Sequence, residues 1–277
     1  MSERTIVITG ASDGIGAQGA RALARTGADV VIVGRSPAKT RAVADLLGAR
    51  YYVTDFSRLD EVRVLAQDLR RDLSRIDVLV NNAGAIFAGR ELTVDNHEKT
   101  MQVNHLAPFL LTTSLLDLLT QSRASVINTS SVAHRLFSKF DVDDLELANR
   151  YSSKIAYGNA KLENILFTKE LHRRYHRHGI SAAAFHPGTV ATNFASETNS
   201  LMRYVYHTPL RRLALISSAR GADTMVWLAT GSPGEDWTSG EYYFRRKVAR
   251  ASDEANDAAP AESLWEQSST WCEETPG

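Results

Sequence analysis

Short β-branched runs, each followed by a longer helical pattern, constrain this chain of 277 residues more than any other feature. The run Thr5–Thr9 precedes a predicted helix at about Ile15–Arg25, and the run Ala28–Val33 precedes one at Pro37–Leu47. Strands that are apolar on both faces and alternate with helices indicate a parallel sheet covered on both sides. The same alternation predicts strands at Ala49–Val53, Asp77–Asn81, Ser125–Asn128 and Ser181–Phe185, and helices at Leu59–Leu73, His97–Thr120, Ile155–His178 and Ser217–Ala229.

The pattern predicts an α/β fold, a doubly wound parallel sheet (Rossmann fold), in a single domain over residues 1–277. No repeat or low-complexity linker divides the chain. Ala195–Leu213 mixes Ser, Thr, Asn, Tyr and Met, and we interpret it as a partly helical substrate lid. Residues 249–277 are predicted to be a C-terminal surface segment, extended over Ala251–Ser263, which Leu264, Trp265 and Trp271 pin back onto the body.

The composition excludes several classes of function. Lys+Arg and Asp+Glu both number 32, so the chain has no electrostatic bias towards nucleic acid or acidic lipid. No apolar run approaches the ~18 residues of a membrane span, and the N-terminus lacks the pattern of a secretory signal. The single cysteine, Cys272, forms no intrachain disulfide. We expect a cytoplasmic protein with no membrane or nucleic-acid partner and no metal.

A glycine-rich turn follows the first predicted strand. Gly10, Gly14 and Gly16 are spaced so that the chain turns tightly, approaches a pyrophosphate and packs helix on strand. The helix N-terminus offers unpaired N–H groups to phosphate. The alternative is a turn without a ligand. The predicted cofactor contacts here are Gly10, Ser12, Asp13, Gly14, Ile15 and Gly16.

The end of the second strand indicates which nicotinamide cofactor binds. NAD-preferring proteins usually carry an acidic residue there for the ribose 2′-OH, whereas this chain has Arg35 and Ser36. These side chains suit a 2′-phosphate, so NADP(H) is favoured over NAD(H), the alternative being that Arg35 is a solvated charge. Further predicted contacts to adenosine are Asp55, Phe56, Asn82, Ala83 and Gly84.

Tyr157 and Lys161 form a Y-x-x-x-K pair whose side chains share one face of a predicted helix. A phenol with a pKa of about 10 is a poor base, and a neighbouring ammonium would lower that pKa. The motif alone is weak, because a second copy is present at Tyr243 and Lys247. That copy looks strand-like, which would separate its two side chains. We therefore choose Tyr157 as the acid/base.

Two further side chains complete the predicted reaction centre. A carbonyl substrate needs a second donor, and the strand at Ser125–Asn128 delivers hydroxyls at its C-terminal end. We choose Ser131, with Ser130 in reserve. Asn104 lies inside a predicted helix, where asparagine is mildly unfavourable, and it is interpreted as the holder of a water that links Lys161 to solvent. The alternative is an ordinary polar residue on a helix face.

The segment after the sixth strand is predicted to face the nicotinamide. Pro187 and Gly188 turn the chain there, while the Val190 backbone and the Thr192 hydroxyl would fix the carboxamide. The apolar positions of Leu106–Leu119 are either core or part of a dimerising helix pair, so a homo-oligomer stays open.

Together these motifs resemble the short-chain dehydrogenase/reductase family over at least residues 4–230. The segments Arg90–Asp95, Gln102–Leu106 and Lys161–Phe167 look like its retinol-dehydrogenase and WW-domain-oxidoreductase-like branch. The resemblance implies an NADP(H)-dependent oxidoreductase that passes hydride to or from an apolar or aromatic carbonyl/alcohol substrate. It also implies a soluble bacterial-type member, since no N-terminal anchor precedes the first strand. The alternatives are a non-catalytic NADP(H)-binding sensor and an epimerase or dehydratase, for which the chain is short.

Overall fold

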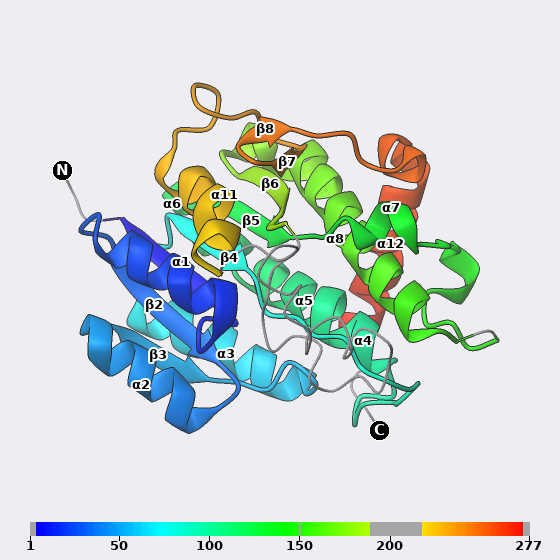
Figure 1. The fold of residues 1–277 in the computed structure, drawn as a ribbon, viewed down its shortest axis with the longest axis horizontal. Helices are drawn as coiled ribbons and strands as arrows, with labels where there is room; N and C mark the ends of the chain where they lie inside the picture. Colours follow the sequence, from blue (N-terminus) through cyan, green and yellow to red (C-terminus); the bar gives the residue numbers. More distant parts are fainter. Residues whose placement is uncertain (1–3, 150, 189–217, 274–277) are drawn as a thin grey trace, which may run out of the picture.

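Strands near the middle of the computed structural model form one sheet in the order β3-β2-β1-β4-β5-β6-β7-β8 (Figure 1). The structure describes residues 4–149, 151–188 and 218–273. Neighbouring strands pair in parallel, except that β8 pairs antiparallel with β7. The strands are β1 (Thr5–Thr9), β2 (Asp29–Gly34), β3 (Arg50–Val53), β4 (Val78–Asn81), β5 (Ser125–Thr129), β6 (Ser181–His186), β7 (Glu241–Phe244) and β8 (Lys247–Val248).

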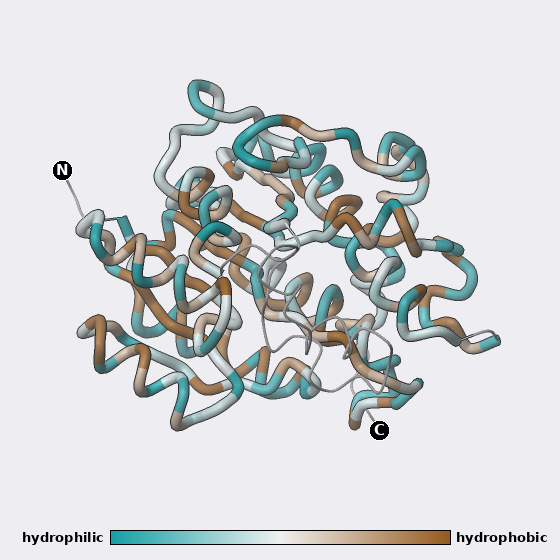
Figure 2. Tube along the Cα trace, viewed as in Figure 1, coloured by the Kyte–Doolittle hydropathy of each residue, from teal (hydrophilic) through white to brown (hydrophobic). Residues whose placement is uncertain are grey.

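Helices cover both faces of this sheet, as the apolar runs predict. Ile6 and Ile8 pack among side chains of α1, α2 and α11, whereas Val7 packs on the opposite face among those of α3, α5 and α8. The inner strands β1, β2 and β4 are accordingly largely brown in Figure 2, whereas the edge strands carry teal and pale residues. The α-helices are α1 (Gly14–Ala24), α2 (Pro37–Leu47), α3 (Leu59–Asp72), α4 (Lys99–Met101), α5 (Ala107–Ser114), α6 (Leu116–Ser122), α7 (Ala133–Leu136), α8 (Ser153–Tyr175), α11 (Ser218–Thr230) and α12 (Ala258–Glu273).

The fold prediction is confirmed, and most element boundaries shift by one or two residues. The main difference is the long helix predicted at His97–Thr120, which divides into α4, a π-helical turn at Gln102–Leu106, α5 and α6. Pro108 has no N–H to bond the carbonyl of Asn104 four residues earlier, which favours a wider turn here. The sequence period alone did not reveal it.

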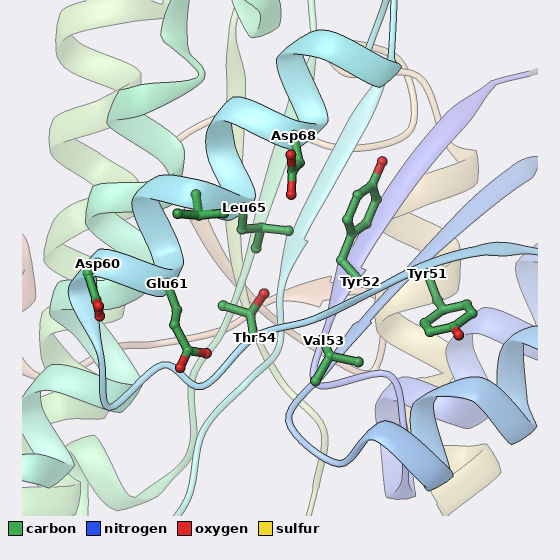
Figure 3. A pocket seen from close by; sticks show the side chains of 9 residues that line it. Tyr51, Tyr52, Val53, Thr54, Asp60, Glu61, Leu65 and Asp68 are labelled. Carbon is green, nitrogen blue, oxygen red and sulfur yellow. The ribbon is translucent and has the colours of Figure 1, made fainter.

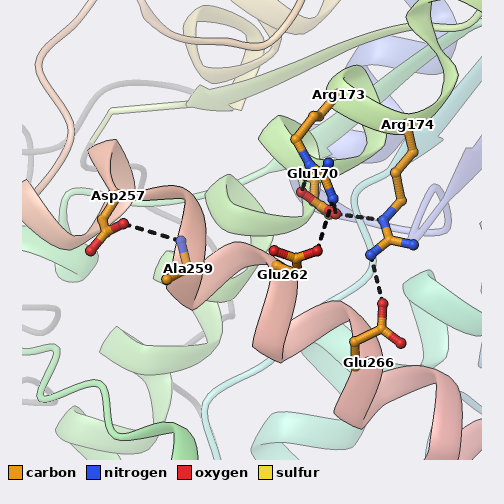
Figure 4. Close-up of polar contacts among 7 residues, drawn as sticks. All are labelled: Glu170, Arg173, Arg174, Asp257, Ala259, Glu262 and Glu266. Carbon is orange, nitrogen blue, oxygen red and sulfur yellow. Dashed lines mark hydrogen bonds and ion pairs between the residues drawn. The ribbon is translucent and has the colours of Figure 1, made fainter.

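The C-terminal segment is helical where an extended stretch was expected. A 3-10 turn at Asp253–Asn256 leads into α12, whose Leu264 and Trp265 are buried. The Trp265 ring lies 5.0 Å from that of Phe109 on α5 and 5.8 Å from that of Phe167 on α8. Figure 4 shows the polar edge of the same contact, where Arg174 donates to Glu266 at 2.6 Å.

The apolar positions of Leu106–Leu119 belong to the core of the chain itself. Leu106, Leu111, Leu115 and Leu119 are fully buried beneath α3, α8 and α12. The core alternative is therefore the one that the structure supports. Within the described ranges, no helix has both the length and the apolar character needed to span a membrane.

Candidate active site

The glycine turn after β1 is packed too closely for side chains. Gly10 and Gly14 have φ of 65° and 55°, a region that favours glycine. A Cβ atom on Gly10 would lie 2.8 Å from the Ala83 Cα, and one on Gly16 would lie 2.6 Å from Asn82 Nδ2. The turn therefore brings the N-terminus of α1 against the end of β4 and leaves bare backbone there, which suits a phosphate group.

Thr9 and Asn82 hold this turn in place. Asn82 Nδ2 donates to the carbonyl oxygens of Thr9 and Gly10 at 3.0 and 3.3 Å. Thr9 Oγ1 accepts from the N–H groups of Asn82 and Ala83, both at 3.0 Å. The predicted cofactor contact of Asn82 and Ala83 stays a prediction, and the structure shows in addition that both residues brace the turn. Thr9 was missed, although a threonine just before the first glycine was the available signal.

Asp13 and Lys39 form an ion pair beside the turn. Asp13 accepts from the Gly14 N–H at 2.7 Å and caps α1, and its second oxygen lies 2.9 Å from Lys39 Nζ. Sequence reasoning named Asp13 and missed Lys39. Since the pair joins α1 to the first turn of α2, only the tertiary structure reveals it. Lys39 offsets the carboxylate where an anionic cofactor would bind.

Arg35 and Ser36 lie where β2 ends, next to the glycine turn. A Cβ atom on Gly34 would lie 2.5 Å from Thr40 Oγ1 and 2.8 Å from the Ser12 Cβ, so the two loops touch. The Arg35 side chain is exposed and Ser36 is half-buried. Arg35, Ser36 and Ser12 therefore lie close together at the edge of the glycine turn.

Asp55 and Phe56 follow β3. The Asp55 carboxylate closes a turn by accepting from the N–H and Oγ of Ser57 at 2.9 and 2.8 Å. The Phe56 side chain is 5% exposed and belongs to the core near Leu59. Its ring thus contributes to packing, and the contact with adenosine stays a prediction for both Asp55 and Phe56.

The two serines after β5 have different surroundings. Ser130 is buried, and its hydroxyl donates to the Lys161 carbonyl at 2.6 Å. Ser131 is half-buried, and its Oγ accepts from the Ala133 N–H at 3.2 Å. An oxygen that already accepts a bond can direct its own proton elsewhere. The geometry thus favours Ser131 over Ser130 as a donor to a ligand.

Tyr157 and Lys161 lie on one face of α8. Lys161 Nζ is 5.3 Å from the centre of the Tyr157 ring. The Lys161 side chain is 2% exposed, and its nitrogen donates to the Thr129 carbonyl at 3.4 Å. Burial lowers the pKa of Lys161 to about 7, opposed by the charge of Glu163.

Both residues of the second Y-x-x-x-K copy lie in strands, as predicted, but on two strands instead of one. The chain turns at Arg245 and Arg246, so Tyr243 and Lys247 lie on the paired strands β7 and β8. The buried Tyr243 hydroxyl is engaged by Thr238, donating to its carbonyl at 2.9 Å. The Tyr243 hydroxyl therefore has a structural role.

Asn104 lies in the π-helical turn, and both hydrogens of its side-chain nitrogen are hydrogen-bonded. Nδ2 donates to the carbonyls of Ala85 and Thr100, both at 2.8 Å. Oδ1 is buried, and no described residue bonds it. A Cβ atom on Gly84 would overlap this oxygen and lie 3.2 Å from Lys161 Nζ. A buried acceptor next to a buried ammonium is suited to an ordered water.

The remaining predicted contacts follow β6. Gly188 has φ of 87°, and its N–H donates to His186 Nδ1 at 3.2 Å, so the turn after Pro187 is present. Val190, Thr192 and the lid at Ala195–Leu213 lie outside the described residues. The predicted site residues that are described gather at the carboxyl ends of the strands, where open sheets bind ligands.

A surface hollow of about 400 Å³ lies elsewhere, between β3 and α3 (Figure 3). Its lining residues include Tyr51, Val53, Glu61 and Asp68, and none of the predicted site residues lines it.

The features of the candidate active site fit a dinucleotide. They are a close-packed glycine turn at a helix N-terminus, and an unpartnered buried oxygen, Asn104 Oδ1, beside Lys161.

The chain resembles known enzymes along nearly its whole length. Residues 4–202 match the family model described as short chain dehydrogenase. The "Putative daunorubicin C-13 ketoreductase DnrU" of Streptomyces sp. (strain C5) is 40% identical over 96% of this chain and 91% of its own length. Human retinol dehydrogenase 13 is 36% identical over 96% of this chain and 83% of its own length.

Solved structures agree with these relatives. A protein from Mycobacterium paratuberculosis superposes with a TM-score of 0.77 and 32% identity, covering 99% of this chain and 95% of its own. A short chain dehydrogenase from Escherichia coli CFT073, complexed with NADPH, has a TM-score of 0.68 and 26% identity. That superposition covers 88% of this chain and 96% of the other.

Proposed function

The chain belongs to the short-chain dehydrogenase family, in its retinol-dehydrogenase-like branch, and from this premise we propose that it passes hydride between NADP(H) and a carbonyl/alcohol pair with Tyr157 as acid/base. The observation that carries the proposal is the buried Lys161 ammonium under the Tyr157 ring, 5.3 Å from its centre. A cation held there favours the phenolate form of the tyrosine.

In the reduction direction each side chain of the site has a separate role. When bound, the nicotinamide supplies the hydride. Ser131 and Tyr157 donate hydrogen bonds to the substrate oxygen and hold the carbonyl for transfer. Tyr157 then gives up its hydroxyl proton, and Lys161 Nζ returns one to it. A water on Asn104 Oδ1 would link Lys161 to solvent and so replace the proton that Lys161 gave. In oxidation each proton moves in the opposite direction.

NADP(H) is the cofactor that we propose, with NAD(H) the weaker alternative. Support comes from the cations at the rim of the glycine turn, Arg35 at the end of β2 and Lys39 on α2. Guanidinium groups bind phosphate with paired hydrogen bonds. The E. coli relative was crystallised with NADPH, which is consistent with this choice.

An apolar or aromatic carbonyl is the proposed substrate class. The names of the relatives support it, since daunorubicin carries an aromatic ring system and retinol is a mostly apolar alcohol. The test is NADPH consumption with a panel of apolar aldehydes, aromatic ketones and quinones. We expect turnover by the wild type and loss of it in Tyr157→Phe, with NADPH affinity retained.

Tyr52→Phe is the matched control, because the Tyr52 hydroxyl bonds Asp72 at the far edge of the sheet. It should turn over like the wild type. NADPH binding without turnover of any carbonyl would favour the sensor alternative, and full activity in Tyr157→Phe would reject the assignment of the base.

A further inference from the structure

His134 is buried three residues after Ser131 and contacts its backbone. The His134 side chain has no exposed surface, and its Nδ1 lies 2.5 Å from the Ser131 carbonyl oxygen. The His134 N–H also donates to this oxygen, at 3.2 Å. Since Ser131 Oγ accepts from Ala133, both ends of the Ser131 residue are tied to the start of α7.

The contact with the Ser131 carbonyl fixes which nitrogen of the His134 ring carries the proton. A carbonyl oxygen only accepts, so Nδ1 must carry the proton. Nε2 is buried, and no described residue bonds it. Burial lowers the pKa of His134, as does the charge of Arg135, while the hydrogen bond to the Ser131 carbonyl and the charge of Glu254 oppose them. The ring therefore stays neutral and presents one directed donor.

The pocket around the ring is built from the neighbouring strands. The Tyr242 ring on β7 meets His134 edge-on, with ring centres 5.0 Å apart. His186, at the end of β6, faces the same region, and burial lowers its pKa to about 4, so it adds no positive charge at neutral pH. The imidazole is thus buried between the Ser131 carbonyl and the Tyr242 ring, which together hold its orientation.

The segment that carries His134 is also locked to the helix of Tyr157. A Cβ atom on Gly158 would lie 2.7 Å from the Ser138 nitrogen and 3.1 Å from the Ala133 oxygen, so backbone meets backbone there. Asn159 accepts from the Lys139 N–H at 2.8 Å and donates to the Lys139 carbonyl at 3.2 Å. The two residues after Tyr157 therefore hold both ends of α7.

We propose that His134 is a positioning residue of the reaction: its Nδ1–H grips the Ser131 carbonyl and so aims the Ser131 hydroxyl at the substrate oxygen beside Tyr157. The inference rests on the proposed function. His134 does not touch substrate in this account. It acts through Ser131, and its effect must disappear when the Ser131 hydroxyl is absent.

The experiment compares three replacements of His134. In His134→Asn the amide nitrogen is as many bonds from Cα as Nδ1, so it can restore the donor. His134→Gln places its nitrogen one bond farther, and His134→Leu has no donor. We expect kcat with an apolar aldehyde to fall by up to about 100-fold in the Leu and Gln variants and to be largely retained in the Asn variant. NADPH affinity should be unchanged in all three.

A double variant separates positioning from general stability. Ser131→Ala combined with His134→Leu should be no slower than Ser131→Ala alone, because interacting residues do not add. His172→Leu is the control, since His172 Nδ1 also lies against a partner, Ser239 Oγ at 2.8 Å, away from the reaction centre. It should keep the wild-type kcat.

Several results would overturn the inference. Full kcat in His134→Leu would do so, as would an Asn variant that loses as much kcat as the Leu variant. Independent, additive losses in the double variant would assign His134 a merely structural role. If the Leu variant does not fold, the comparison of Asn with Gln decides. A wild type that binds NADPH and turns over no carbonyl rejects the proposed function instead.

Discussion

The side-chain oxygen of Asn104 and the ammonium nitrogen of Lys161 approach each other across Gly84. A Cβ atom on Gly84 would overlap Asn104 Oδ1 and lie 3.2 Å from Lys161 Nζ. Neither φ nor a turn requires glycine at this position, since Gly84 is not among the residues with positive φ. The absence of a side chain instead leaves open the space beside which these two polar groups lie.

Gly84→Ala should therefore reduce activity. The added methyl group forces Asn104 or Lys161 to move, and overpacking of this kind costs about 1–3 kcal/mol of stability. We expect a lower kcat and a lower unfolding temperature, measured by NADPH consumption and thermal unfolding. Gly89→Ala is the control, because a Cβ atom there meets nothing within 4 Å. Equal behaviour of the two variants would contradict the prediction.

Gly158→Ala should separate the Ser131 segment from α8. Alanine favours a helix by about 1 kcal/mol over glycine, yet its Cβ would lie 2.7 Å from the Ser138 nitrogen and 2.8 Å from the Phe137 carbonyl carbon. Backbone atoms cannot swing away, so the overlap should outweigh the helix preference. We expect kcat/KM for the carbonyl to fall while the NADPH Kd holds. A variant more stable than the wild type and equally active would refute this.

Arg35→Ala should weaken NADPH binding and barely change NADH binding. A hydrogen bond to a charged group contributes about 1.5–3 kcal/mol, or roughly 10- to 100-fold in Kd. Titration of both cofactors measures the ratio of their affinities. Arg41→Ala serves as control, because Arg41 pairs with Asp45 on α2. An unchanged ratio in Arg35→Ala would mean that Arg35 is not the selector.

The contribution of Lys161 to the stability of the cofactor-free protein should grow as the pH rises from about 7 towards 10.5. Burial lowers the pKa of Lys161 from 10.5 to about 7 in the folded state, so the unfolded chain binds the extra proton across this window. The free energy of unfolding rises with pH wherever the unfolded state holds more protons. Stability from this group is complete above the unfolded pKa and is lost as the pH falls through the folded one.

Lys161→Met isolates that contribution. Its free energy of unfolding, from denaturant titrations at several pH values, should show a flatter slope between pH 7 and 10.5 than the wild type. Lys169→Met is the control, because that side chain contacts Asn256 on the surface at 3.5 Å. Parallel slopes for the wild type and Lys161→Met would mean that the burial of Lys161 does not cause this pH dependence of the free energy of unfolding.

Sequence reasoning succeeded where the signal is local. The six predicted strands and the helix at Pro37–Leu47 are present because β-branched runs and a helical period report burial directly. It was less successful where the cause is tertiary. The helical period of the sequence does not reveal the π-helical turn at Asn104. Nor does it reveal the Lys39–Asp13 pair, which joins two separate helices.

The C-terminal helix shows a different kind of error. Ala251–Ser263 reads as an extended surface stretch because it is rich in Ala, Asp, Glu and Ser. Alanine and glutamate are also strong helix formers, and Leu264 and Trp265 supply a buried face. His134 was missed for a related reason, since its contact with the Ser131 carbonyl depends on the short turn of α7.

The packing of α12 has a consequence for anyone who shortens or tags this enzyme. The stretch that matches the family model ends at residue 202, so it leaves α12 out. Yet Ser268 on α12 bonds His105, the neighbour of Asn104, at 2.9 Å, and Trp265 shields the aromatic side chains of Phe109 and Phe167. Removing α12 would expose Phe109 and Phe167 to water and would remove the partner of His105 next to Asn104. Fusions and purification tags therefore belong at the N-terminus.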